Sequence, residues 1–575
     1  MKTTDVDSTA YRAAAAATDG QRRAFLARLL ALGAGTFGAG AFAEHAAAVT
    51  LAQDAPLRDS YDYIIVGAGS AGCLLADRLS AGGASVLLLE AGGGDIAQPS
   101  VSQVALWQQN LGSATDWARV AVPQPHLAGR QPAAPAGKVL GGSGSINAMI
   151  WLRGDPRDHT QWERHAGPGW SAQALDRAYL RIVRPATTGV AGGPMQPGRI
   201  GIGRYAHAHP LTQAYMTAGI ATGLRPIELN AGRPLDGVGV TDVNALPNGR
   251  RSGPAQALLV PALARANLKV LPYAPIMKLT VRDGACLGVE AMVGGRKLTF
   301  HAARETIVSA GACQTPKILM LSGLGPEAHL ASHGIRTRVH LPAVGSHLQD
   351  HVLVSLLFRS RATLPAPVSN GVSTMAYYSN SGRHLAPDVQ IAGMQYPFGS
   401  TEPVGSAYSV IAFLAKPRSS GDVRLTSADP FQQMRIDPRY LDQGIDQDNL
   451  LLGLDRAIET GTGMRNLYGG MLSQVGRSRR EKLDFIARNG DAGLHFVGTC
   501  RAGRDPATSV VDADFRVWGV KRLRVVDASV IPEIPAVNIH ASVLTVAQLA
   551  AERLLDEAHA ADPHDSVAAR IANDL

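Results

Sequence analysis

The sequence predicts an α/β fold in which a domain with a parallel sheet carries an inserted domain built on an antiparallel sheet. An apolar run at 63–66 is followed by a glycine turn, a helical segment and a second apolar run at 85–89, which is the order of a βαβ unit. Another strand and helix are predicted at 306–320. Between these α/β segments and the C-terminus, 389–394 and 408–413 have the pattern of antiparallel strands, which predicts a second domain that caps the first.

The first turn, between the strand at 63–66 and the helix at 73–79, fits a dinucleotide-binding fingerprint. Gly67 allows a tight turn, Gly69 lets a pyrophosphate approach the backbone, and Gly72 lets the helix pack closely on the strand. The helix N-terminus directs N–H groups and a partial positive charge at the phosphates. Glu90 ends the second strand, where it is placed to accept hydrogen bonds from an adenosine ribose.

The same turn has two other interpretations. It can be a tight βα turn with no ligand, or a nucleophile elbow in which Ser70 attacks an ester, since 68–72 nearly fits G-x-S-x-G. Ala68 stands where that pattern has its first glycine, and Gly67 and Glu90 would then have no role. The dinucleotide interpretation is therefore favoured, with Ser70 and Ala71 in the first helical turn beside the phosphates.

The remaining elements follow in order. A Gly/Ser run at 137–151 offers N–H groups to a flat ligand, and Asn147 within it can bond to a ring edge. Later segments are predicted as a strand at 267–271, hairpin strands at 281–293 and 297–300, a strand at 306–311, a helix at 315–320 that starts with Pro316 in its first turn, a strand at 523–526 and a terminal helix from about Ser542.

Composition excludes several classes of protein. The chain has 575 residues, 46% apolar and 18% charged, so its bulk is globular rather than disordered. A net charge of +8 with scattered basic residues gives no reason to expect nucleic-acid binding. The four cysteines lack metal-ligand spacing, and the histidines do not cluster, so we predict no metal site and no disulfide framework.

Residues 1–50 have the pattern of an export leader. Arg22 and Arg23 precede x-Phe-Leu and an Ala/Gly/Leu run, and 41–43 offers a small-x-small cleavage site, so the segment resembles a twin-arginine signal. That pathway carries proteins already folded, so we expect a periplasmic or exported protein that uses the twin-arginine machinery. The alternative is an uncleaved N-terminal helix that keeps the protein at the membrane, although the run is short and glycine-rich for a span.

Taken together, the ordered blocks resemble the glucose–methanol–choline (GMC) family of flavin oxidoreductases, choline dehydrogenase-like or alcohol oxidase-like, over nearly all of 60–556. The motifs that carry the resemblance are the glycine turn with Glu90, 137–154, 311–325, 344–351, His495 to Thr499, 525–529 and Asn538.

The resemblance implies a bound FAD and an alcohol substrate. It implies that His495 takes the hydroxyl proton while hydride leaves the carbon for flavin N5, and that Asn538 orients the alcohol oxygen. His540 is not expected to substitute for Asn538, although it can point into the same site. Besides the glycine turn and Glu90, the implied cofactor contacts are Gly142, Ser143, Asn147, Ala148, Ile276, Asp527, Ala528 and Asn538.

The chain departs from some relatives at informative positions. Ile146 stands where some relatives tether FAD through a histidine, so we expect non-covalent FAD. Leu494 precedes His495 where an aromatic residue is common, which argues against an aryl-alcohol cage, and no carboxylate is assigned to a choline ammonium. The electron acceptor, a quinone, a cytochrome or O₂, stays open. A lyase or photodecarboxylase that keeps FAD is the alternative within the family.

The resemblance also suggests how the chain is divided. We expect an FAD-binding Rossmann-like domain from 57–165, 246–350 and 491–560, and a substrate-binding cap domain from 166–245 and 351–490. Residues 561–575 are expected to form a C-terminal tail.

Overall fold

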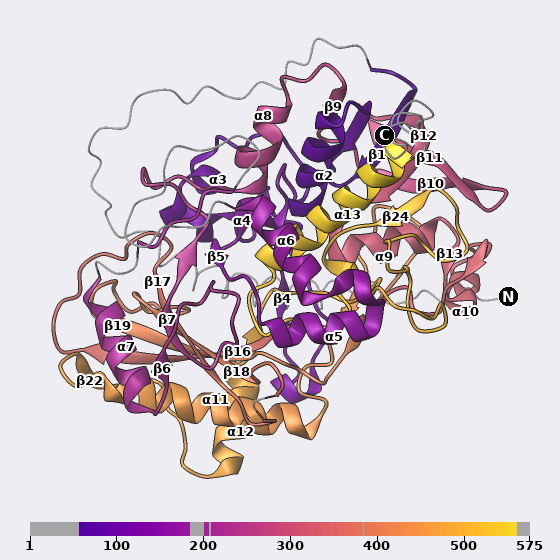
Figure 1. Ribbon diagram of the computed structural model, residues 1–575. Coiled ribbons are helices and arrows are strands. Elements are labelled where there is room, and N and C mark those ends of the chain that lie inside the picture. The colour runs from indigo at the N-terminus through magenta and orange to yellow at the C-terminus, as the bar shows by residue number, and fades with distance from the viewer. Residues whose placement is uncertain (1–56, 184–199, 206–208, 383, 561–575) are drawn as a thin grey trace, which may run out of the picture.

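The computed structural model describes residues 57–183, 200–205, 209–382 and 384–560, and two large sheets organise it (Figure 1). The leader predicted at 1–50 and the tail at 561–575 lie outside the described residues. Within the described residues, no helix combines the length and apolar character that a membrane crossing needs.

The first sheet has seven strands in the order β10-β11-β12-β1-β2-β9, with β24 paired to β12. Strands β12, β1, β2 and β9 run parallel, as does β24 beside β12, whereas β10 and β11 extend the sheet antiparallel. The strands are β1 (Ser60–Val66), β2 (Val86–Leu89), β9 (Leu268–Leu271), β10 (Ile276–Arg282), β11 (Ala285–Val293), β12 (Arg296–Val308) and β24 (Leu523–Val525).

Two predicted boundaries in this sheet are wrong. The strands predicted at 297–300 and 306–311 are one continuous strand, β12, because its first half pairs with β11 and its second half with β24. The strand predicted at 281–293 is divided by a turn at Asp283 and Gly284, whose φ angles are +50° and +72°. Each half of the hairpin then pairs along its whole length.

Helices α2 (Ser70–Ala81) and α13 (His540–Ala560) pack against each other beside the parallel sheet, and α6 (Ala172–Ile182) packs on α13. Helix α9 (Gly311–Leu321) begins four residues earlier than predicted, so Pro316 lies inside it rather than in its first turn. Proline has no N–H to donate to the carbonyl of Ala312. The Thr499 hydroxyl donates to that carbonyl at 2.5 Å instead, which satisfies the backbone group.

The second sheet has eight strands in the order β22-β16-β19-β18-β17-β7-β6, with β23 paired to β16. The strands predicted at 389–394 and 408–413 are confirmed as β18 and β19, and they run antiparallel. The strands are β6 (Arg225–Pro226), β7 (Gly237–Val240), β16 (Val352–Ser360), β17 (Val372–Tyr378), β18 (Val389–Met394), β19 (Ala407–Leu414), β22 (Tyr468–Met471) and β23 (Asp491–Ala492).

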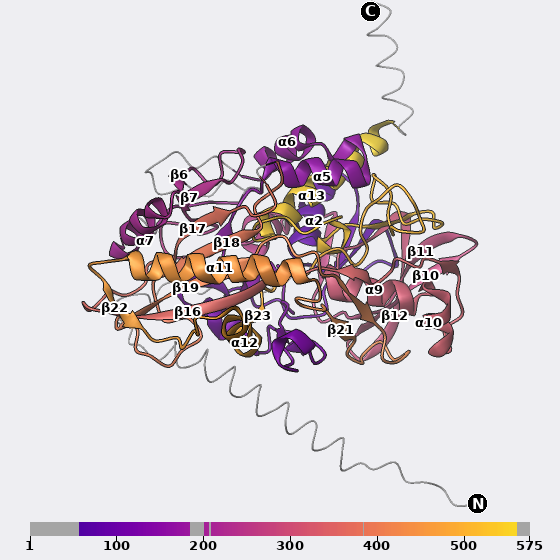
Figure 2. The same cartoon turned by 90° about the horizontal axis from the view of Figure 1, so that it is seen from below.

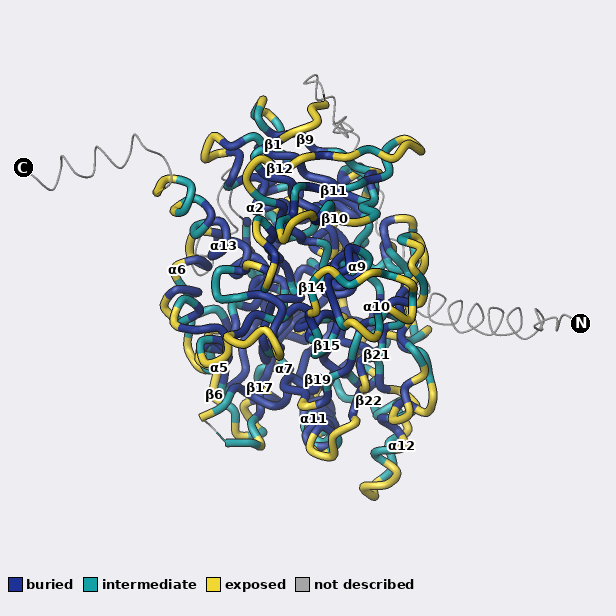
Figure 3. Tube along the Cα trace, turned by 90° about the vertical axis from the view of Figure 1, so that its right-hand side faces the viewer, coloured by how far each residue is buried: buried dark blue, intermediate teal, exposed yellow. Residues whose placement is uncertain are grey.

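Helix α11 (Gly444–Gly463) crosses the outer face of this sheet (Figure 2). Because side chains alternate along a strand, Val389 and Ile391 of β18 belong to the apolar cluster that includes Leu450 and Leu454 of α11. Gln390, between them, points to the opposite face. The inner face of the sheet is therefore directed toward the rest of the molecule, and the interior between the sheets is buried, whereas exposed residues gather at the periphery (Figure 3).

The remaining elements are short or lie at the surface. The helices are α3 (Pro99–Ser102), α4 (Ser143–Ile146), α5 (Pro156–Ala166), α7 (Pro210–Ala221), α8 (Val260–Ala262), α10 (Glu327–Ser332) and α12 (Arg479–Asn489). The strands are β3 (Arg119–Val120), β4 (Ala133–Ala134), β5 (Ile150–Trp151), β8 (Asp242–Val243), β13 (Leu324–Gly325), β14 (Val339–His340), β15 (Ser346–Leu348), β20 (Gly421–Arg424) and β21 (Arg435–Asp437).

Candidate active site

A cavity of about 1200 Å³ lies between the end of β1 and the inner face of the antiparallel sheet. It brings together nearly all the residues that the sequence singled out, although they are spread over more than four hundred positions of the chain. The predicted residues that line it are Gly67, Gly69, Ser70, Ala71, Glu90, Gly142, Ser143, Asn147, Ala148, Ile276, His495, Asp527, Ala528 and Asn538.

Gly72 does not line the cavity. It contributes to the fold by letting α2 pack closely against the turn. A Cβ added to Gly72 would lie 1.9 Å from the carbonyl oxygen of Gly67, so only glycine lets α2 approach the turn. A Cβ on Gly69 would meet only the Ser309 carbonyl oxygen, at 3.9 Å, and otherwise faces open space. The turn therefore leaves a cradle beside Gly69, at the N-terminus of α2, where Gly69 is the N-cap and no side chain caps the helix.

Glu90 holds the turn and faces the cavity. Its carboxylate accepts hydrogen bonds from the backbone N–H groups of Ala68, at 2.9 Å, and Gly92, at 2.8 Å. Burial raises the pKa of Glu90 to about 7, against the effect of these bonds. A carboxylate has about four acceptor positions, so acceptor capacity remains for ribose hydroxyls.

The second glycine run lies directly against the first. Gly142 has a φ of +53°, and a Cβ there would lie 2.7 Å from the Cα of Gly69. Asn147, five residues later, accepts hydrogen bonds at Oδ1 from Arg251 Nη1, at 2.7 Å, and from the N–H of Met149, at 3.0 Å. Its Nδ2 hydrogens are therefore what Asn147 can offer to a ligand. Sequence reasoning missed Arg251, which is fully buried and fixes this orientation.

These observations test whether the residues fit the FAD that the resemblance implies. The open cradle at Gly69, the uncapped N-terminus of α2 and the Glu90 carboxylate suit a diphosphate and a ribose. Asn147 stands further along the same cavity and offers an amide. The residues present fit the group. Ile146 also lines the cavity, and its side chain has no nucleophile that could form a tether.

The predicted catalytic pair is in direct contact. His495 Nε2 lies 3.1 Å from Asn538 Nδ2, and both residues line the cavity. Gln390 of β18 donates from Nε2 to Asn538 Oδ1 at 3.2 Å, which fixes the amide with Nδ2 toward His495. The antiparallel sheet thus orients one member of the pair.

A second histidine, His351, fixes the tautomer of His495. His351 Nε2 lies 3.0 Å from the carbonyl oxygen of Pro535, which can only accept, so this nitrogen carries a proton. Burial lowers the pKa of His351 well below its ordinary value, so the ring is neutral and its Nδ1 is an acceptor. His351 Nδ1 lies 2.9 Å from His495 Nδ1, which must therefore be the donor. The Nε2 of neutral His495 is therefore an acceptor, and Asn538 Nδ2 donates to it at 3.1 Å.

Asp350 clamps the backbone that carries His495. One carboxylate oxygen accepts from the N–H of His495 at 2.5 Å, and the other accepts from the N–H of Leu494 at 3.3 Å and the Tyr440 hydroxyl at 2.5 Å. Leu494 has a φ of +65°, a left-handed conformation that side chains rarely adopt. Asp350 thus stabilises a strained turn that aims His495 at the cavity. Burial raises the pKa of Asp350 to about 7.

Burial also sets the protonation state of the base. It lowers the pKa of His495 to about 4, because the charged imidazolium loses solvation and no carboxylate side chain contacts the ring among the described residues. His495 is therefore neutral near neutral pH, which is the form that can accept a proton.

Two other residues that the sequence singled out lie in the cavity wall outside the catalytic pair. His540 starts α13 and lines the same cavity, as it was expected to be able to do, but neither of its ring nitrogens has a hydrogen-bond partner, and its ring packs edge-on against Trp151. Among the described residues, no hydrogen bond joins the Ser70 hydroxyl to a histidine or a carboxylate, so a hydrolase triad around Ser70 is not formed. Both residues remain parts of the cavity wall.

Comparisons with known proteins agree over most of the chain. Models of the N-terminal and C-terminal parts of the GMC oxidoreductase family match residues 61–353 and 417–547. An oxygen-dependent choline dehydrogenase from Sinorhizobium medicae is 33% identical over 531 residues, covering 86% of this chain and 95% of that protein. The solved structure of pyridoxine 4-oxidase from Mesorbium loti matches with a TM-score of 0.78 and 31% identity, covering 86% of this chain and 98% of that one. A formate oxidase from Aspergillus oryzae, whose structure concerns FAD modification, matches with a TM-score of 0.79 and 26% identity over 87% of this chain and 98% of that one.

Proposed function

Since the chain belongs to the GMC oxidoreductase family, we propose that it oxidises an alcohol to an aldehyde or ketone with His495 as general base and Asn538 as its partner. The observation that carries the proposal is the unprotonated Nε2 of His495, held 3.1 Å from the Asn538 amide in the cavity that suits FAD. Loop position alone would not distinguish His495 from a structural histidine.

The residues divide the work of the reaction. When bound, FAD supplies the hydride acceptor. The alcohol replaces the direct bond between the pair: its hydroxyl donates to His495 Nε2, and an Nδ2 hydrogen of Asn538 donates to the alcohol oxygen and stabilises its developing negative charge. The proton moves to Nε2 while the Nδ1–H of His495 stays bonded to His351. The ring therefore accepts a proton without turning.

The sheet wall of the cavity supports a substrate with an apolar skeleton. The residues that line it from β16, β17, β18 and β19 are neutral, and they are Leu353, Ser355, Leu357, Val372, Ala392, Met394, Ile411 and Phe413. The carboxylate that this sheet presents to the cavity is Asp491 of the short strand β23, beside β16.

We propose that FAD is held without a covalent bond, since Ile146 occupies the tether position. Acid precipitation of the purified yellow protein should release all flavin into the supernatant, with the absorbance spectrum of free FAD. Flavin that stays with the precipitated chain would overturn this part of the proposal.

The leader lies outside the described residues, and export remains a proposal that rests on Arg22 and Arg23. Replacing both arginines by lysine should leave the protein in the cytoplasm, because the twin-arginine machinery reads the pair. Unchanged periplasmic protein would count against this pathway. Washed membranes that retain the protein with 1–43 uncleaved would favour the anchor alternative.

Anaerobic stopped-flow mixing with a panel of alcohols tests the proposed function. Bleaching of the oxidised flavin by an alcohol supports it, and the same mixtures reoxidised by O₂ or by a quinone-like dye identify the acceptor class. A flavin that no alcohol bleaches would refute alcohol oxidation and favour the lyase or photodecarboxylase alternative.

A further inference from the structure

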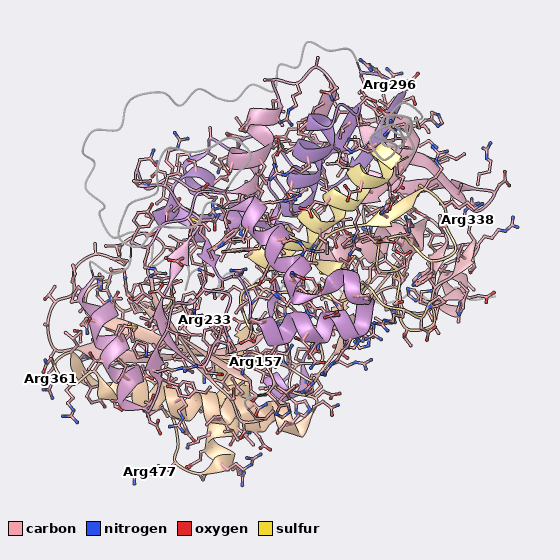
Figure 4. The ribbon with its side chains drawn as sticks, viewed as in Figure 1. Arg157, Arg233, Arg296, Arg338, Arg361 and Arg477 are labelled. Atoms are coloured by element: carbon pink, nitrogen blue, oxygen red, sulfur yellow. The ribbon has the colours of Figure 1, made fainter. Side chains whose placement is uncertain are left out.

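Arg119 is a buried cation in the cavity wall with unused hydrogen-bond donors. It lies on β3 and is 5% exposed, and it lines the same cavity as His495. Its Nε and Nη2 atoms are buried and have no hydrogen-bond partner. By contrast, Arg296, Arg338, Arg361 and Arg477 extend outward at the edge of the molecule, where water solvates them (Figure 4). A buried guanidinium with unpaired donors is costly unless a ligand meets it.

No carboxylate of the described residues pairs directly with Arg119. The charge of Asp116 acts on Arg119 without an ion pair, and its two oxygens accept from the N–H groups of Gly112, Ala118 and Ala136. The described residues contain no carboxylate within ion-pair distance of Arg119, whose side chain instead contacts the Trp117 ring, 4.8 Å away, and the Cys313 thiol.

A second cation stands nearby. Lys317 lines the cavity from α9 and lies close enough to Arg119 for their charges to repel. Its Nζ donates to the neutral carbonyl oxygens of Pro430, at 2.7 Å, and Gln432, at 2.6 Å, and the charge of Asp429 acts on it without an ion pair among the described residues. Two neighbouring cations in one buried wall favour binding of an anion in the cavity beside them.

Arg119 lies nearer to His495 than to the cradle at Gly69. Arg119 of β3 pairs with Ala134 of β4. Ala134 and Cys313 belong to one apolar cluster, and Phe496, directly after His495, packs against it. The cradle at Gly69 is built instead by α2 and the second glycine run. Arg119 therefore lies on the His495 side of the cavity.

We propose that Arg119 is a specificity-determining residue that binds a carboxylate carried by the alcohol substrate. This inference rests on the proposed function and names its substrate class: hydroxy acids with an apolar skeleton between the hydroxyl and the carboxylate. The hydroxyl meets His495 and Asn538, the skeleton lies along the neutral wall of the antiparallel sheet, and the carboxylate meets the free donors of Arg119.

The test compares matched substrates in the holoenzyme. The probes are ω-hydroxyalkanoates of increasing chain length with the corresponding 1-alkanols, and 4-(hydroxymethyl)benzoate with 4-(hydroxymethyl)benzamide. For at least one carboxylate of suitable length, we expect kcat/KM to exceed that of its neutral match. Arg119→Gln should lower kcat/KM for that carboxylate about 10- to 100-fold, the usual range for a hydrogen bond to a charged group, and hardly change it for the neutral match. Arg119→Lys should retain part of the preference, because it keeps the charge but loses the planar fork.

Arg488→Gln is the matched control, because Arg488 lines the mouth of the same cavity but is exposed. It removes the same charge and should leave the preference unchanged. If Arg488→Gln lost as much of the preference for carboxylate substrates as Arg119→Gln, the preference would depend on net charge rather than on Arg119. That result would overturn the proposal. So would Arg119→Gln protein that binds FAD more weakly but keeps its substrate preference when saturated with FAD, since the anion would then be the cofactor's diphosphate.

Wild-type protein provides a test that does not depend on folding of a variant. Alkanoates that cannot be oxidised should perturb the flavin spectrum saturably and compete with the substrate, whereas alkanamides of the same length should not. Equal binding of acids and amides would overturn the proposal. If neutral alcohols bleach the flavin but carboxylates show no preference, this inference fails alone; if no alcohol of either kind does, the proposed function itself fails.

Discussion

His351 and His495 meet through their Nδ1 atoms at 2.9 Å, and the bond from His351 to the Pro535 carbonyl decides which of the two rings donates. The catalytic ring thus receives its tautomer from a residue that does not touch the substrate oxygen in this arrangement. His351 is a positioning residue, and its effect should be visible in pH dependence as well as in rate.

His351→Ala should lower the rate constant of flavin reduction about 3- to 10-fold, the usual value of one neutral hydrogen bond, because His495 loses the partner that fixes its tautomer. The space left by the ring admits water, so the pKa of His495 should rise from about 4 toward its ordinary value. Stopped-flow rates against pH measure both effects. His159→Gln, at a buried histidine outside the cavity lining, is the control and should leave the profile unmoved.

His495→Ala should slow flavin reduction by about 10²–10⁴-fold while FAD stays bound, since that is the usual contribution of general-base catalysis. Asn538→Ala should cost less, because the base remains, and His540→Ala should cost less than either, because its ring nitrogens form no hydrogen bond to either member of the pair. Anaerobic stopped-flow absorbance measures each variant. Bleaching at full speed in His495→Ala would remove His495 from the mechanism.

The pH dependence follows from the buried base. Because burial lowers the pKa of His495 to about 4, the neutral form dominates at every pH well above that value. Titration of His495 should therefore lower the rate constant of flavin reduction only as the pH approaches about 4, whereas a limb near pH 7 is expected from Asp350, whose pKa burial raises to about 7. A limb near the ordinary histidine pKa of about 6.5 that persists in Asp350→Asn would show that His495 is solvated in the working enzyme.

Gly69 and Gly72 should respond differently to the same substitution. In Gly69→Ala the new Cβ meets only the Ser309 oxygen at 3.9 Å, so the apoprotein should melt near the wild-type temperature but bind FAD more weakly. In Gly72→Ala the Cβ would lie 1.9 Å from the Gly67 oxygen, so the fold itself should be destabilised. Thermal unfolding of apoprotein and FAD titration separate the two effects. Equal loss of stability in both variants would contradict the assignment of Gly69 to the ligand.

Local patterns in the sequence were enough to predict the residues that would bind the cofactor. Gly67, Gly69 and Glu90 belong to one βαβ unit, so their spacing along the chain is enough to predict how they are arranged in space. The strands at 389–394 and 408–413 were predictable for the same reason, since alternation is a local property. The start of α9 was not, because the hydroxyl that compensates Pro316 comes from Thr499.

The catalytic half depended on the resemblance for its two central residues and on the tertiary structure for the rest. Gln390 and Arg119 carry no local signal, because each is an ordinary residue on a strand far along the chain from its partner. His351 lies in the motif at 344–351, but that motif gave it no role. Their roles arise when the antiparallel sheet and the short strand β3 close over the end of β1. By itself the sequence determined the fold class, the glycine cradle and its acid, because these rest on short-range geometry. Only the tertiary structure decided the tautomer of His495, the orientation of Asn538 and the unpaired charge of Arg119, because hydrogen bonding and desolvation depend on which distant groups become neighbours.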